Sequence, residues 1–199
     1  MNHLAHFWLA DADPLHRLGV ALGDFWRGSV PSEWPQPLRE GLAWHRRVDS
    51  LTDSHTAVVE ARNRFVPPYR RYAGILLDMW CDHALARGFG ERTGLDLEQF
   101  SSTYLADLRM AMGQVENWMP WPDHFLKFVA WLERDAVLPA YAAPDTIERT
   151  LAGIGRRLQR DNPLHEAWPI LADRASELDD LAWIVLQDLD RGHRPGRMT

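Results

Sequence analysis

Apolar residues recur at intervals of three and four along most of the chain, which is the spacing of one face of an α-helix. The segment 69–89 is an example, with an apolar side that includes Leu77, Trp80 and Leu85. Nowhere do apolar and polar residues alternate between turn signals, as they do in a half-buried β-strand. The pattern therefore predicts an all-α protein.

Prolines, glycines and capping residues divide this pattern into separate helices. Asn2 can cap a short first helix, and Asp13-Pro14 supplies an N-cap and a first helical residue for the second. The remaining boundaries predict helices at 14–26, 38–55, 56–66, 69–89, 95–119, 123–136, 145–160 and 164–191, with a proline-rich loop at 28–37. We expect a single-domain multi-helix bundle over residues 1–191 and a flexible tail over 192–199.

The size and composition fit one globular domain, since 46% of the 199 residues are apolar and 25% are charged. Cys81 is the only cysteine, so no intramolecular disulfide can form, which suits a reducing cytoplasm. The apolar stretch 4–10 follows no basic segment and is interrupted by His6, which argues against a signal peptide. No apolar run is long enough to span a bilayer, so we expect a cytoplasmic protein without a membrane partner.

The charge of the chain is acidic overall but its cations are almost all arginine. Twenty-two basic against 28 acidic residues leave a formal net charge of −6, which argues against general nucleic-acid binding. Lys127 is the only lysine, and arginine suits the recognition of phosphate and carboxylate groups. An "arginine patch" around Pro67-Pro68 could meet an acidic partner, although a solvated helix face is the ordinary interpretation. Its members are Arg62, Arg64, Arg70 and Arg71.

A row of one imidazole and two carboxylates lies in the predicted helix 38–55. His45, Asp49 and Asp53 are four residues apart, and because a helix turns by about 100° per residue they share one face. A single His-x-x-x-Asp pair is more often a surface hydrogen bond or charge pair, which contributes only about 0.3–0.5 kcal/mol. This row alone therefore leaves both interpretations open.

A second row lies in the predicted helix 69–89, where Asp78 and Asp82 are again four apart and His83 flanks the same edge. If the two helices crossed with their rows face to face, they would enclose two imidazoles and four carboxylates. Mixed nitrogen and oxygen ligands suit manganese, iron or zinc better than calcium. Carboxylates among apolar residues must be paired or bound to metal, so the two rows together predict a metal or catalytic site.

A third group of candidates lies near the N-terminus. Asp24 closes the predicted helix 14–26 just before a loop, where its side chain could reach into a site, and Arg27 could clamp a phosphate oxygen. Each also has a plain structural interpretation, with His6 as a satisfied core histidine and Asp24 as the ion-pair partner of Arg27. The sequence contains no phosphate-binding glycine loop, no nucleophile elbow and no repeated Glu-x-x-His of di-iron bundles.

These residues stand in four motifs that resemble a known family. The motifs are Met1-Asn2-x-Leu4-Ala5-His6, Gly-x-x-x-x-Asp-Phe-x-Arg-Gly over 19–28, His45-Arg46-Arg47-Val48-Asp49-x-x-Thr52-Asp53, and Leu77-Asp78-x-x-x-Asp82-His83-x-Leu85. In this order and at this spacing, over residues 1 to about 90, the chain resembles acyl carrier protein phosphodiesterase. That family is a divergent relative of the HD-domain phosphohydrolases, so the resemblance implies an HD-domain-like helical fold.

The resemblance also implies a reaction, in fatty acid and lipid metabolism. It is hydrolysis of the phosphodiester that joins a carrier-protein serine to 4′-phosphopantetheine, which converts holo acyl carrier protein into the apo form. A divalent metal is expected, with Mn²⁺ first and Mg²⁺ or Fe²⁺ as alternatives.

Roles for individual residues follow from the resemblance as expectations. The implied metal ligands are His45, Asp49, Asp82 and His83. Asp24 or Asp78 could complete the set, and Asp53 or Asp78 could orient or deprotonate the attacking water. His6 is the candidate acid for the departing serine oxygen.

The arginines have two expected roles. Arg46, Arg47 or Arg27 would neutralise the non-bridging phosphate oxygens. The arginine patch would meet the acidic carrier protein, an attraction that salt weakens.

Two alternatives remain open at this stage. The same metal site could act on a nucleotide or another small phosphodiester. Alternatively, the chain could be a non-catalytic helical module that binds carrier protein without turnover. The sequence leaves the oligomeric state open.

Overall fold

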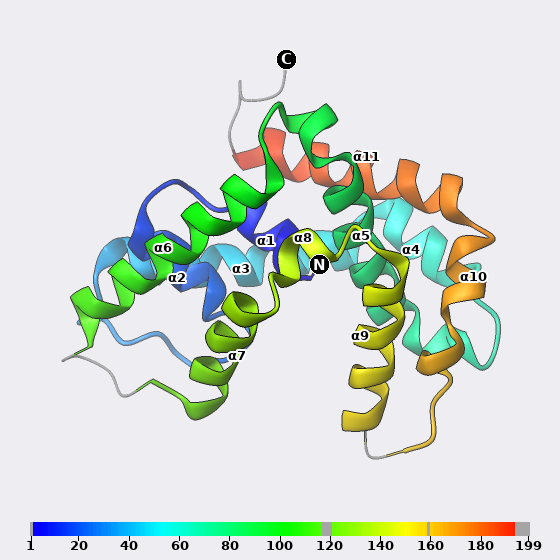
Figure 1. The fold of residues 1–199 in the computed structure, drawn as a ribbon, viewed down its shortest axis with the longest axis horizontal. Helices are drawn as coiled ribbons and strands as arrows, with labels where there is room; N and C mark the ends of the chain where they lie inside the picture. The colour runs from blue at the N-terminus through cyan, green and yellow to red at the C-terminus, as the bar shows by residue number, and fades with distance from the viewer. Residues whose placement is uncertain (1, 117–120, 159, 194–199) are drawn as a thin grey trace.

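The computed structural model describes residues 2–116, 121–158 and 160–193, and every regular element among them is helical (Figure 1). The elements are α1 (His3–Leu9), α2 (Pro14–Ala21), α3 (Gln36–Ser54), α4 (Thr56–Asn63), η1 (Tyr69–Tyr72), α5 (Ala73–Thr93), α6 (Leu97–Val115), α7 (Asp123–Arg134), α8 (Val137–Ala140), α9 (Pro144–Arg157), η2 (Leu164–Glu166), α10 (Trp168–Ala172) and α11 (Ala175–His193). The predicted all-α, single-domain fold is confirmed. None of the described helices has the length and hydrophobicity to cross a bilayer.

Two helix groups meet around the short helix α1. On one side α2 packs against α3 and α6, and on the other α5 packs against α11. Helix α1 contacts α2, α5 and α11, and it lies near the middle of the molecule (Figure 1). Helices α7 and α9 extend from this frame in the same general direction (Figure 1). The arrangement buries α1 and leaves α7 and α9 to build the walls of a cavity described below.

Helix α1 is stabilised by its surroundings, since a helix of seven residues is marginal in water. All its residues except His3 are buried. Asn2 stands at the N-cap position, but its side chain makes no capping hydrogen bond. The backbone N–H groups of Leu4 and Ala5 donate instead to the two carboxylate oxygens of Asp82 on α5, at 2.8 and 2.9 Å. A residue from a distant helix therefore caps α1.

Helices α2 and α3 approach closely at two glycines. A Cβ atom on Gly19 would collide with the carbonyl oxygen of Leu38, and one on Gly41 would collide with the carbonyl oxygen of His16. Backbone atoms cannot turn aside as a flexible side chain can, so neither position has room for a side chain at this helix separation. The close approach fixes where α3, which carries His45 and Asp49, lies relative to the N-terminal segment.

Several predicted boundaries differ from those observed. The second predicted helix ends at Ala21, because residues 22–25 turn away from the helix axis. The segment 164–191 divides into η2, α10 and α11, with Pro169 in the first turn of α10, where its missing N–H costs nothing. Helix α11 continues to His193, past the predicted boundary, and residues 194–199 lie outside the described residues. The predicted end of 95–119 also lies outside them.

Replacing Gly19 with alanine tests the close approach of α2 and α3. Alanine favours a helix over glycine by roughly 1 kcal/mol, but the clash with Leu38 should reverse this gain and lower the free energy of unfolding by about 1–3 kcal/mol. Gly113 in α6 is the matched control, because no described atom outside its own helix backbone lies within 4 Å of its added Cβ. Chemical denaturation should show Gly113→Ala unchanged or more stable; an equally stable Gly19→Ala would contradict the packing described.

Candidate metal centre

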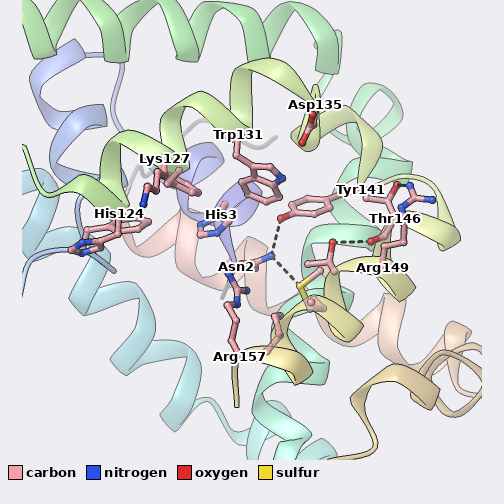
Figure 2. A pocket seen from close by; sticks show the side chains of 16 residues that line it. Asn2, His3, His124, Lys127, Trp131, Asp135, Tyr141, Thr146, Arg149 and Arg157 are labelled. Atoms are coloured by element: carbon pink, nitrogen blue, oxygen red, sulfur yellow. Dashed lines mark hydrogen bonds between the residues drawn. The ribbon is translucent and has the colours of Figure 1, made fainter. Parts of the chain in front are cut away.

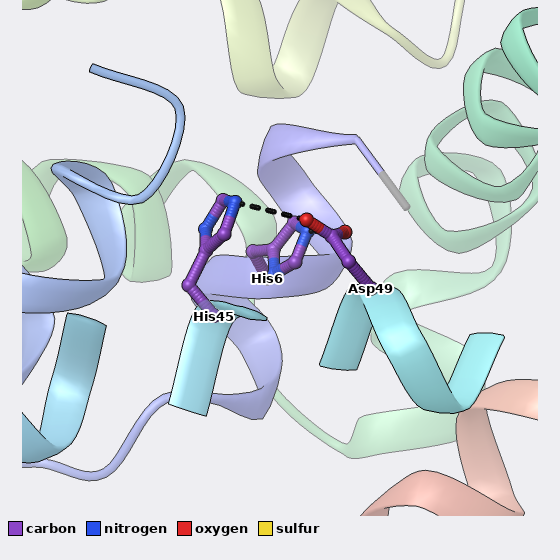
Figure 3. Close-up of side chains that lie close together, drawn as sticks. All are labelled: His6, His45 and Asp49. Carbon is purple, nitrogen blue, oxygen red and sulfur yellow. Dashed lines mark hydrogen bonds and ion pairs between the residues drawn. The ribbon is translucent and has the colours of Figure 1, made fainter. Parts of the chain in front are cut away.

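Two imidazoles and a carboxylate converge where α1 crosses α3. His6, His45 and Asp49 each offer a ligand atom, and these atoms lie within 4.8 Å of one another (Figure 3). His6 Nε2 lies 3.0 Å from Asp49 Oδ1, and His45 Nε2 lies 3.3 Å from Asp49 Oδ2. The imidazole rings stack with centroids 3.8 Å apart. Both histidines are buried, whereas the Asp49 side chain is 43% exposed, so the group opens to solvent at its carboxylate.

A second carboxylate borders this group. Asp24 Oδ1 lies 3.5 Å from His45 Nε2, and its Oδ2 lies 3.8 Å from Nδ1 of His3. The preceding residue must be glycine for this arrangement, because a Cβ on Gly23 would collide with the His45 ring. The turn after α2 therefore packs directly on His45 and brings Asp24 beside it.

Burial and charge give the two imidazoles opposite protonation. Burial lowers the pKa of His6 to about 3, despite its hydrogen bond to Asp49. Burial also disfavours the charged form of His45, but hydrogen bonds to Asp24 and Asp49 outweigh it and raise its pKa to about 9. The pKa of Asp24 falls to about 2, because its interactions with His45 outweigh burial. At neutral pH the centre therefore contains two carboxylates, one imidazolium and one neutral imidazole.

The donor set fits a divalent cation. Ligand atoms at about 2.0–2.2 Å from one ion lie no more than about 4.4 Å from each other, close to the spacing of this group. Imidazole nitrogen together with carboxylate oxygen suits manganese, iron or zinc. His6, His45 and Asp49 could hold such an ion, with Asp24 beside them.

A cavity of about 800 Å³ adjoins this centre. Helices α7 and α9 line opposite sides, and the start of α1 lies between them (Figure 2). His3 belongs to both places, since it lines the cavity and lies beside Asp24. The sequence indicated no role for the α7 and α9 residues of this cavity, because their apolar and polar positions follow the pattern of ordinary amphipathic helices.

The family model described as acyl carrier protein phosphodiesterase matches residues 1–189 of the chain. The chain belongs to this family. The match extends well beyond the first 90 residues that carried the resemblance, which is thereby confirmed.

Individual relatives support the same family assignment. Proteins named acyl carrier protein phosphodiesterase from Klebsiella pneumoniae (strain 342) and Enterobacter sp. (strain 638) are 32% and 33% identical over 185 residues, covering 92% of this chain and 92% of each relative. The protein of that name from Photorhabdus laumondii is 33% identical over 186 residues, with 92% and 90% covered. No solved structure matches the chain. The name of these relatives denotes a phosphoric diester hydrolase.

Two of the four ligands suggested by the family resemblance lie away from the centre. Asp82 is fully buried and uses both oxygens to cap α1. His83 Nδ1 lies 2.7 Å from the carbonyl oxygen of Tyr141, and its ring packs against Trp80 and Trp168. Asp82 thus faces the start of α1 and not the row on α3, and His83, one residue on, points about 100° away from Asp82.

The two candidate bases also differ in their surroundings. Asp53 forms an ion pair with Arg62 of α4 and is exposed. Asp78 is half-buried, and burial raises its pKa, with a further contribution from the charge of Asp49. The negative charge of Asp49 therefore acts on Asp78. Asp53 lies one turn further along α3 and pairs with Arg62 instead.

The candidate phosphate-binding arginines are exposed. Arg46 donates to the carbonyl oxygen of Trp26 at 3.0 Å, the Arg47 guanidinium lies 6.0 Å from the Trp44 ring, and Arg27 is exposed. Arg46 thus ties α3 to the loop that follows Asp24.

The arginine patch is partly neutralised. Arg62 pairs with Asp53, and Arg64 pairs with Glu177. Arg70 donates to Asn63, and Arg71 lies over the Tyr72 ring. The patch is therefore less cationic than its sequence alone indicates.

Asparagine at position 82 distinguishes capping from metal ligation. Asp82→Asn keeps one acceptor oxygen for α1, so we expect unfolding to become easier by about 1–3 kcal/mol, with Mn²⁺ affinity falling less than about tenfold. Asp49→Asn should lower Mn²⁺ affinity by on the order of 100-fold with little loss of stability. Calorimetric titration and urea denaturation measure both. If Asp82→Asn lost Mn²⁺ binding as Asp49→Asn does, yet remained stable, Asp82 would be a ligand after all.

Metal binding should release a proton. Below pH about 9 His45 carries a proton in the metal-free protein, and a ligand nitrogen must lose it, whereas His6 is already neutral. Mn²⁺ affinity should therefore rise with pH up to about 9 and then level. Titrations at pH 7.5 in buffers of different ionisation enthalpy should show about one proton released per ion. A count of zero would exclude His45 as a ligand.

Proposed function

We propose that this chain is a metal-dependent phosphodiesterase that removes 4′-phosphopantetheine from holo acyl carrier protein and leaves the apo form, a step in fatty acid and lipid metabolism. The observation that carries the proposal is the convergence of His6, His45 and Asp49, formed by two motifs of the family to which the chain belongs. We further propose the HD-domain relationship of the fold on the same basis.

His6, His45 and Asp49 would hold the divalent ion, and Asp24 would complete or orient the set. This choice replaces Asp82 and His83 by His6 and Asp24, because the first two are engaged elsewhere. When bound, Mn²⁺, or alternatively Mg²⁺ or Fe²⁺, lowers the pKa of a water molecule toward neutrality and offsets phosphate charge. The exposed edges of Asp49 and Asp24 give a phosphodiester access from solvent.

The protein groups around this centre would transfer protons and neutralise the charge of the phosphate oxygens. Asp78 is the better candidate to exchange a proton with water or with the departing serine oxygen, since burial raises its pKa and so favours its protonated form. Asp53 would instead hold Arg62 in place. Arg46 and Arg27, which are exposed, would face the non-bridging phosphate oxygens, where guanidinium donors form strong charge-assisted hydrogen bonds.

The partner would be the acidic carrier protein, which would contact the surface that carries the arginine patch. Arg70 and Arg71 are exposed and make no ion pair among the described residues, so within the arginine patch they are the best placed to meet carboxylates. Their contribution would lie mainly in the association rate and would weaken with salt.

A small phosphodiester is the second candidate substrate, and the cavity beside the centre is the observation that favours it. A cavity of this size accommodates many small ligands. It equally accommodates the arm of a holo carrier protein, so the two substrates are separated by experiment. A binding module without turnover would differ from both by lacking stoichiometric metal.

Incubation of the protein with holo acyl carrier protein and Mn²⁺ should remove the phosphopantetheine mass from the carrier protein, and a chelator should block the loss. Asp49→Asn should slow the reaction by on the order of 100-fold or more, because it removes a ligand, while Asp53→Asn on the same face should keep most activity. Intact-mass spectrometry reads each result. Unchanged carrier mass with metal-loaded protein would refute the proposed reaction and favour a small phosphodiester; unchanged mass with metal-free protein would favour the binding module.

A further inference from the structure

His3 links the cavity between α7 and α9 to the metal centre. His3 lines the cavity, and its Nδ1 lies 3.8 Å from Asp24, which in turn lies 3.5 Å from His45. The His3 ring also contacts the Phe128 ring, with centroids 4.6 Å apart. A phosphate at the centre would therefore have the mouth of this cavity directly beside it.

The cavity is lined by both apolar and polar groups. Phe25, Phe128 and Trp131 form an aromatic wall on the centre side and along α7, and Ile154 lies opposite on α9. Rings of this wall contact one another, with Phe25 and Phe128 centroids 4.8 Å apart. Such a wall would cover the methylene and methyl groups of an extended chain.

One polar group in the cavity has unused hydrogen-bonding capacity. Tyr141 is fully buried, and its hydroxyl oxygen accepts from Asn2 Nδ2 at 3.4 Å (Figure 2). In the part of the chain that the structure describes, its own O–H proton has no acceptor. Burial raises the pKa of Tyr141, so the hydroxyl stays protonated and remains a donor. A buried donor facing a cavity suits a carbonyl oxygen of a ligand.

The cavity also has a cationic rim. Lys127 extends from α7, and Arg149 and Arg157 extend from α9. Arg157 points toward Asn2 and His3, near the end that adjoins the metal centre (Figure 2). An anionic group at that end would thus be met by a guanidinium as well as by a metal ion.

We propose that this cavity holds the pantetheine arm of the substrate, with the phosphate at the metal centre, the chain along the aromatic wall and an amide carbonyl on the Tyr141 hydroxyl. A phosphorylated chain of apolar groups and amides matches a lining of aromatic and aliphatic side chains, cationic groups and a buried hydroxyl donor. The inference rests on the proposed function and locates the arm within it. The carrier protein then stays outside, and only its arm enters.

Gly153 gives a direct test, because it lies in α9 and lines the cavity. Outside the backbone of its own helix, the nearest described atom to an added Cβ is Nη2 of the flexible Arg156, at 3.7 Å, so a side chain can be added at this position. Gly153→Phe should obstruct the cavity, and Gly153→Ala is the matched control at the same position. Circular dichroism checks that each variant folds.

The ligands are 4′-phosphopantetheine and inorganic phosphate, titrated calorimetrically into the Mn²⁺-loaded protein. The unmodified protein and Gly153→Ala should bind 4′-phosphopantetheine at least about tenfold more tightly than phosphate, and Gly153→Phe should lose that preference. Tyr141→Phe, which keeps the shape, should weaken 4′-phosphopantetheine binding by about 3–10-fold and leave phosphate binding unchanged.

Equal affinities of the unmodified protein for the two ligands would overturn the assignment, as would a preference that survives Gly153→Phe. A Gly153→Phe protein that bound 4′-phosphopantetheine normally but had a raised KM for holo carrier protein would show that a segment of the carrier protein occupies the cavity. The binding titrations need no turnover, whereas the comparison of KM values does. The proposed function is tested separately by intact-mass spectrometry, where an unchanged mass of the carrier protein would refute it.

Discussion

The hydrogen bonds from the start of α1 to Asp82 hold the site together. A seven-residue helix has too few internal hydrogen bonds to persist alone, and its own N-cap side chain is turned elsewhere. The Asp82 carboxylate replaces that cap, and a negative group is favourable at a helix N-terminus. Burial raises its pKa to about 7, although the two backbone N–H groups favour the ionised form. His3 and His6 flank the capped residues, so the position of both imidazoles depends on this contact.

The freed Asn2 side chain connects the cap to the cavity. Because Asp82 satisfies the N–H groups of Leu4 and Ala5, Asn2 can donate to Tyr141 and to the sulfur of Met79 instead. Helix α1 thereby places His6 in the metal centre and His3 in the lining of the cavity. The two parts of the site share one short helix, which explains why they adjoin although their walls come from opposite halves of the chain.

The site residues whose proximity follows from the sequence are those whose relation is local. His45 and Asp49 are one helical turn apart, so the helix geometry alone brings them together. The resemblance added His6 and Asp24 as participants, although it suggested acid catalysis for His6, whereas the structure brings its ring into contact with His45. Asp82 and His83 show the limit, since a row on one helix does not reveal which neighbour it faces.

The sequence by itself determined the helical class, most helix positions and the row of His45 and Asp49, because these follow from periodicity and from residues within one turn. Tertiary structure alone decided that α5 caps α1, that Gly23 lets Asp24 reach His45, and that α7 and α9 enclose a cavity. Each of these depends on contacts between segments far apart in the chain, and the same apolar stripe on a helix permits many such partners. Packing selects one of them, and with it the group of side chains that can act together.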